Sequence, residues 1–126
     1  MPPTELRFHP VAAVKGLPFS EAVQAGNLLF LSGQIGLDAR GKLVAGGVGP
    51  ETIQAMENVR GALARLGSSL DRIVKVTVMM VDMGEWSAMN AEYVKFFPNH
   101  LPARSAFGTS GLALGARVEI ECIAAL

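Results

Sequence analysis

Two segments of the chain carry charged side chains that could bind a carboxylate or exchange a proton. The first, Pro102–Ser105, places Arg104 at the start of a predicted strand, directly after a proline-bounded loop. A guanidinium offers a planar fork of N–H donors that matches a carboxylate, and each charge-assisted bond of this kind is worth roughly 1.5–3 kcal/mol. The spacing alone favours a solvated arginine or a structural ion pair.

The second segment, Val118–Ala124, alternates apolar residues with Glu119 and Glu121. Such alternation is typical of a strand with one buried face. A partly buried carboxylate has a raised pKa and can exchange protons near neutral pH. An exposed sheet face explains the same pattern equally well.

Other residues with reactive side chains do not form recognisable motifs. The glycines of Gly46–Gly49 complete neither a dinucleotide-binding nor a P-loop pattern, and Ser32 and Ser110 do not lie in G-x-S-x-G. The single cysteine, Cys122, is expected in the core rather than as a nucleophile, and it cannot form an internal disulfide. With only two histidines beside it, we expect no metal site and no metal cofactor.

The elements that must position these residues follow from the hydrophobic periodicity. Ala22–Ile35 predicts two strands joined at Gly26, and the apolar run Leu28–Leu31 is typical of a strand buried on both faces. The stretch Gly36–Gly49 predicts a loop, with a brief strand at Lys42–Val44. Helical spacing of apolar residues predicts a helix from Pro50 to a stop at Gly67.

The second half of the chain predicts a central strand over Ile73–Val81. Asp82 is expected to cap a second helix, whose apolar stripe of Trp86, Met89, Tyr93 and Phe96 or Phe97 ends before Pro98. Strands at Arg104–Thr109 and Val118–Ala124 follow. This order predicts an α+β fold, a mixed sheet with both helices on one face.

Composition limits the classes of function. The 126 residues fit one domain, residues 1–126, and 50% are hydrophobic, which for so short a chain indicates a buried subunit interface. Eleven basic and eleven acidic residues cancel, so we expect no nucleic-acid partner. Neither a secretory signal nor an apolar run long enough to span a membrane is present, so we expect a cytoplasmic protein.

Over nearly its whole length, the sequence resembles the RidA/YjgF/UK114 family of enamine and imine deaminases. The blocks that carry the resemblance occur in the family's order and spacing: Pro18–Val23, Gly26–Ile35, Glu57–Val59, Val74–Val78, Met89-Asn90, Tyr93, Phe96-Phe97, Pro102–Ser105 and Val118–Glu121.

The resemblance implies a chorismate-mutase-like fold that assembles as a homotrimer, with ligand clefts between subunits. It also implies hydrolysis of 2-aminoacrylate and 2-iminopropanoate-type intermediates to 2-ketoacids and ammonia, without a cofactor. By similarity, Arg104 holds the substrate carboxylate, and Glu119 positions the water and passes its proton. Phe19, Ser32, Gly33, Asn90 and Ala106 are the corresponding substrate-binding positions.

Two departures from the family pattern bear on activity. Phe19 stands where tyrosine is usual, and Ala106 stands where cysteine is common. The missing hydroxyl has two interpretations, weaker activity or a bulkier, more apolar imino acid. It also keeps open a trimer that binds 2-ketoacids without turnover. The endoribonuclease or translation-inhibitor role attached to some family members is disfavoured by the neutral charge.

Overall fold

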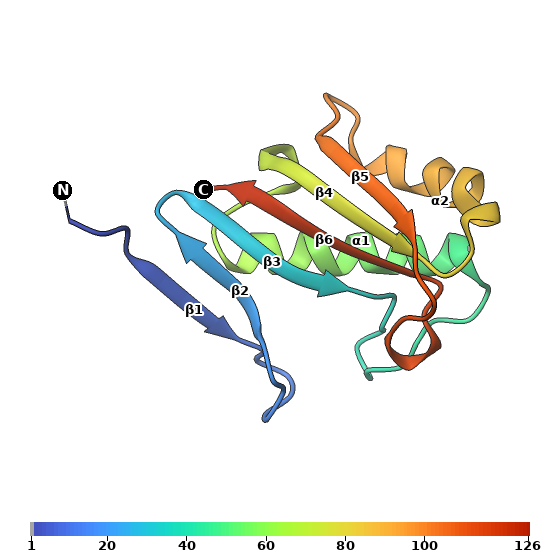
Figure 1. Ribbon diagram of the computed structural model, residues 1–126, viewed down its shortest axis with the longest axis horizontal. Coiled ribbons are helices and arrows are strands. Elements are labelled where there is room, and N and C mark those ends of the chain that lie inside the picture. The colour runs from blue at the N-terminus through green and yellow to red at the C-terminus, as the bar shows by residue number, and fades with distance from the viewer. Residues whose placement is uncertain (1) are drawn as a thin grey trace.

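The computed structural model of the chain describes residues 2–126, which form one sheet covered by helices on one face (Figure 1). The strands are β1 (Leu6–Pro10), β2 (Ser20–Ala25), β3 (Leu28–Gln34), β4 (Ile73–Met80), β5 (Ala103–Gly108) and β6 (Val118–Ala125). They lie in the order β1-β2-β3-β6-β4-β5, with β4 and β5 parallel and the other neighbours antiparallel. The predicted mixed sheet is confirmed.

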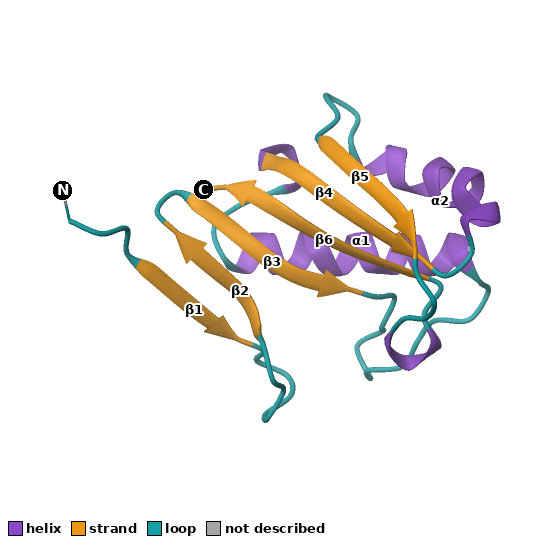
Figure 2. Ribbon diagram, in the orientation of Figure 1, coloured by secondary structure: helices purple, strands orange, loops and turns teal. Residues whose placement is uncertain are grey.

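Two α-helices, α1 (Val48–Arg65) and α2 (Trp86–Tyr93), lie side by side behind the sheet (Figure 2). Both pack on the same face, as predicted, and β1 and β2 extend beyond them. The described part of the chain also contains four short 3₁₀ helices: η1 (Leu70–Arg72), η2 (Met83–Glu85), η3 (Val94–Phe96) and η4 (Ala113–Gly115).

The core lies between α1 and the middle of the sheet. β6 alternates throughout and β4 alternates from Lys75 onwards, so Val76, Val78 and Ile120 are buried against the helices while their neighbours face the other way. From α1, Met56 and Leu63 fill the space beneath them with no exposed surface. Burial of this stripe on α1 stabilises the helix more than its propensity does.

The predicted first helix is confirmed, with its start two residues earlier than expected, at Val48. It ends as predicted around Gly67, whose φ of +90° is the left-handed conformation that favours glycine. The Ser68 N–H donates to the Leu63 carbonyl at 2.8 Å, and the Gly67 N–H donates to Ala64 at 3.4 Å. These two bonds form a Schellman cap.

The second predicted helix is divided. Asp82 caps the 3₁₀ helix η2, accepting a bond from the Gly84 N–H at 2.8 Å, and α2 begins directly afterwards at Trp86. The brief strand expected at Lys42–Val44 is reduced to one bridge between Leu37 and Leu43.

The expectation that Leu28–Leu31 is buried on both faces is wrong for this chain. Leu29 and Leu31 face the helices and are buried, whereas Phe30 is 42% exposed. Within residues 2–126 no layer covers the opposite side of the sheet, which we call the open face (Figure 2). Glu119 and Phe107 also lie on this face, because each alternates with residues that face the helices.

Candidate functional site

Arg104 is held on the helix side of the sheet by side chains from α2. It pairs in register with Val76, which is buried beneath the helices, so the two side chains share that face. The Arg104 Nη1 donates to Asn90 Oδ1 at 2.7 Å. The guanidinium carbon lies over two aromatic rings, 5.0 Å from the Trp86 centroid and 4.8 Å from the Tyr93 centroid.

The spacing of these three α2 residues explains how they converge. Trp86, Asn90 and Tyr93 stand at i, i+4 and i+7, which places them on one helix face. The sequence assigned Trp86 and Tyr93 to a buried apolar stripe, and Tyr93 is buried. It did not indicate that both rings contact Arg104. The one indication in the sequence was the polar Asn90 on that same, otherwise apolar, helix face.

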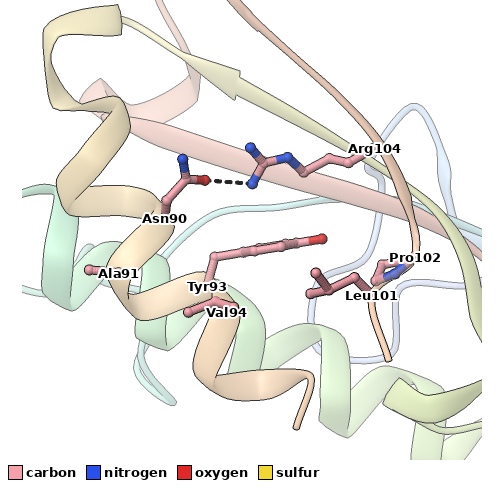
Figure 3. A pocket seen from close by; sticks show the side chains of 7 residues that line it. All are labelled: Asn90, Ala91, Tyr93, Val94, Leu101, Pro102 and Arg104. Atoms are coloured by element: carbon pink, nitrogen blue, oxygen red, sulfur yellow. Dashed lines mark hydrogen bonds between the residues drawn. The ribbon is translucent and has the colours of Figure 1, made fainter. Parts of the chain in front are cut away.

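A cavity of about 540 Å³ lies beside this cluster (Figure 3). Its walls come from α2, from the loop before β5 and from Arg104: Asn90, Ala91, Tyr93, Val94, Leu101, Pro102 and Arg104. The walls are mainly apolar, with the guanidinium as the charged group. That combination suits a small anion with an apolar end.

Glu119 occupies the opposite side of the sheet, above Gly33 of β3. A methyl group on Gly33 would lie 1.9 Å from Glu119 Oε2, so glycine is required for the carboxylate to lie there. Burial, with a smaller effect from Glu121, raises the pKa of the Glu119 carboxyl above its ordinary value. The group is therefore a better proton acceptor than an exposed glutamate.

The chain leading into Glu119 is anchored at Arg117. The Arg117 backbone N–H donates to Oε1 of the buried Glu51 at 2.8 Å, and its Nε donates to Glu85 Oε1 at 2.7 Å. These bonds tie the start of β6 to α1 and to η2. The position of Glu119, two residues later, is thereby fixed by the core.

The other predicted site residues divide between the two sides. Phe19, 53% exposed, lines a groove of about 810 Å³ together with Gly33, Glu119 and residues of α1, so this groove reaches round to the helix side of the sheet. The Ser32 hydroxyl donates to the Ser20 carbonyl at 2.6 Å. Ala106 packs against the hydrophobic core and is not among the lining residues of either cavity.

The structure therefore separates the two predicted catalytic residues. Arg104 and Asn90 lie on the helix side at the edge strand β5, whereas Glu119, Gly33 and Phe19 lie at the other groove. One chain does not bring Arg104 and Glu119 onto one small molecule. A site that uses both requires two copies of the chain.

Two further features of the described chain bear on its chemistry. Within residues 2–126, no three side chains of histidine, cysteine, aspartate or glutamate come close enough together to hold a metal ion. Over the same residues, no helix has the length and apolar content needed to cross a membrane.

Comparison with known proteins gives matches over most of the chain. The model of a family described as endoribonuclease L-PSP matches residues 11–126. The 2-iminobutanoate/2-iminopropanoate deaminase of Mus musculus is 43% identical over 108 residues, which cover 85% of this chain and 80% of that protein. The chloroplastic Reactive Intermediate Deaminase A of Arabidopsis thaliana is 41% identical over 86% of this chain and 59% of its own length.

Solved structures agree with these matches. Yeast Mmf1 superposes with a TM-score of 0.84 at 38% identity, covering 98% of this chain and 97% of its own. The YjgF gene product of E. coli gives a TM-score of 0.82 at 30% identity, covering 94% and 92%. With a matching fold, matching sequence blocks and a family model that spans residues 11–126, the chain belongs to the RidA/YjgF/UK114 family.

Proposed function

We propose that this protein is a deaminase that hydrolyses reactive enamine and imine intermediates of the 2-aminoacrylate and 2-iminopropanoate type to 2-ketoacids and ammonia. The observation that carries the proposal is the state of Arg104. Its guanidinium is fixed at a cavity wall, and no carboxylate among residues 2–126 forms an ion pair with it. The names of the mouse and Arabidopsis relatives support the same reaction.

In the proposed site, Arg104 binds the substrate carboxylate with the N–H groups that Asn90 leaves free. Asn90 and the two aromatic rings restrict the guanidinium to one orientation. Holding the substrate in a fixed pose lowers the entropic part of the barrier. Lysine would supply the charge without the planar fork.

Glu119 accepts a proton from water as the water oxygen forms a bond to the imine carbon. The C=N π electrons move to nitrogen, which takes up a proton. In the resulting carbinolamine, Glu119 transfers the hydroxyl proton to the amino nitrogen; the C=O bond then forms as the C–N bond breaks, and ammonia leaves. One water is consumed for each imine, and the raised pKa of Glu119 suits a group that takes and returns the proton.

We further propose that the protein is a homotrimer whose clefts combine Arg104 of one protomer with Glu119, Gly33, Ser32 and Phe19 of the next. The separation of Arg104 and Glu119 within one chain supports this arrangement. The uncovered face of the sheet supports it too, because Phe30 and Phe107 are 42% and 48% exposed there. Asn90 on α2 and Ala106 on β5 are proposed to lie on the side of the cleft that Arg104 provides.

The experiment mixes two inactive variants. Arg104→Ala and Glu119→Gln are each expected to lose imine clearance in an assay that generates imines with an amino-acid oxidase. In randomly assembled mixed trimers, about one quarter of the clefts combine an intact Arg104 with an intact Glu119, so that fraction of wild-type activity should return. If mixing restores nothing, the shared cleft is wrong. If Arg104→Ala clears imines as fast as wild type, the catalytic assignment is wrong.

One observation favours the alternative of a ketoacid-binding trimer without turnover: Phe19, which lacks a hydroxyl, lines the same groove as Glu119. Binding of a 2-ketoacid without imine hydrolysis would favour it.

The family description as an endoribonuclease receives no support from charge, since eleven basic residues balance eleven acidic ones. The cytoplasmic location stays a prediction, because the relatives include proteins labelled chloroplastic and mitochondrial.

A further inference from the structure

Two buried side-chain hydroxyls lack a hydrogen-bonding partner among residues 2–126. They belong to Tyr93 in α2 and Thr52 in α1, which are 4% and 0% exposed. Folded proteins pair nearly all buried polar atoms, so each such group needs a reason. Thr52 is in the wall of neither cavity, whereas Tyr93 lines the cavity at Arg104.

Packing explains the ring of Tyr93 but not its hydroxyl. The ring stacks at a tilt on Phe97, 5.0 Å between centroids, and lies beneath the Arg104 guanidinium. A phenylalanine would make both contacts. The oxygen adds the cost of removing a polar atom from water and gains no bond within the described chain.

The position of the hydroxyl points to a ligand. In Figure 3 the hydroxyl end of Tyr93 lies between the Arg104 side chain on one side and Leu101 and Pro102 on the other. Leu101 is 63% exposed and lines the same cavity as Tyr93. Burial raises the pKa of Tyr93 to about 12, and the nearby Arg104 guanidinium opposes the rise through its charge and through N–H donors close to the hydroxyl, although none of them is within full hydrogen-bonding geometry. The group remains a proton donor at neutral pH.

We infer that the Tyr93 hydroxyl is a second donor to the carboxylate that Arg104 binds. This inference rests on the proposed function, because it assigns a further residue to the same substrate site. Arg104 supplies charge and Tyr93 supplies a directed O–H donor from beneath the guanidinium. The substrate class this pair selects is a small 2-imino or 2-keto acid whose carboxylate reaches into the cavity and whose remaining atoms contact Val94 and Leu101.

The test compares Tyr93→Phe with Thr52→Val, because each removes one unpartnered hydroxyl and little else. The probe is 2-oxobutanoate, titrated calorimetrically, and thermal unfolding is followed in parallel. We expect Tyr93→Phe to bind the probe about tenfold more weakly, which corresponds to about 1.4 kcal/mol, with a Tm equal to or above that of wild type. We expect Thr52→Val to leave affinity unchanged.

A structural role for the hydroxyl predicts a lower Tm for Tyr93→Phe with unchanged affinity, and that result would overturn the inference. So would wild-type protein that fails to bind 2-oxobutanoate. Imine hydrolysis is measured separately. A wild type that binds the ketoacid but clears no imine refutes the proposed deaminase, and the affinity of Tyr93→Phe still decides this inference.

Discussion

A single methyl group at Gly33 should separate the role of Glu119 from that of Arg104. Gly33 lies in β3 directly beneath the Glu119 carboxylate, and its φ is not in the left-handed region, so the backbone accepts alanine. The added Cβ would lie 1.9 Å from Glu119 Oε2 and 2.7 Å from its Cδ, where ordinary contact begins at 3.4 Å. The carboxylate oxygen must therefore move by about 1.5 Å.

The size of that movement sets the expected loss. A displacement of about 1 Å in a catalytic group can cost about a hundredfold in rate, or about 2.7 kcal/mol of transition-state stabilisation. We expect Gly33→Ala to lower kcat by about a hundredfold or more. The clash involves the end of a flexible side chain rather than backbone, so the free energy of unfolding should change by no more than about 1 kcal/mol.

The assay is steady-state imine hydrolysis alongside 2-oxobutanoate affinity and thermal unfolding. Affinity should fall by less than kcat, because the proposed carboxylate site at Arg104 belongs to the neighbouring protomer while Gly33 lies only on the other wall of the shared cleft. The single variant Glu119→Gln and the double variant Gly33→Ala/Glu119→Gln should have the same kcat, because both substitutions act through the Glu119 carboxylate. The reasoning is refuted if Gly33→Ala keeps half of wild-type kcat, or if the double variant is much slower than Glu119→Gln.

Four other predictions follow. Arg104→Lys should raise KM at least about tenfold through the loss of bidentate geometry, while Arg40→Lys on an exposed loop should not, and equal effects would refute the assignment. The acid limb of kcat/KM should lie above pH 4.5, the ordinary glutamate value, and Glu121→Gln should move it lower, because Glu121 helps to raise the Glu119 pKa. Because the pKa of Glu119 is higher in the folded than in the unfolded protein, its contribution to stability is full below the unfolded-state pKa and is lost as pH rises through the folded-state pKa. At pH 7 we therefore expect Glu119→Gln to be more stable than wild type. Burial raises the pKa of the Cys122 thiol to about 12, so native protein should resist iodoacetamide at pH 8 and react after unfolding, and rapid alkylation of the native protein would contradict that environment.

Elements with a strong period and one buried face could be predicted from the sequence. α1, β4 and β6 each alternate or repeat at the spacing that burial requires, and the bounds differ from expectation by about two residues. The strand β1 was missed because Leu6–Pro10 is exposed or half-exposed throughout, so no burial pattern marks it. Its ladder with β2 is held by backbone bonds, which composition does not reveal.

The residues of the candidate site could be named from the sequence, but not their division between two faces. Glu119 alternates with buried neighbours, which predicts the open face, yet the side to which Arg104 points depends on its register with Val76. The sequence of β5 has no clear apolar alternation that would mark its buried face, so this register could not be predicted from the strand itself. The contacts of Trp86 and Tyr93 with Arg104 were hidden for a similar reason, since aromatic residues at helical spacing are typical of a core.

The separation of Arg104 from Glu119 has a further electrostatic consequence. Arg117 shows what a nearby carboxylate does, because its Nε lies 2.7 Å from Glu85 and its charge is neutralised within the chain. Arg104 instead contacts a neutral amide and two ring faces, which fix the guanidinium without cancelling its charge. In the proposed shared cleft, the substrate carboxylate would become the partner of Arg104, and Glu119 of the next protomer would accept the proton.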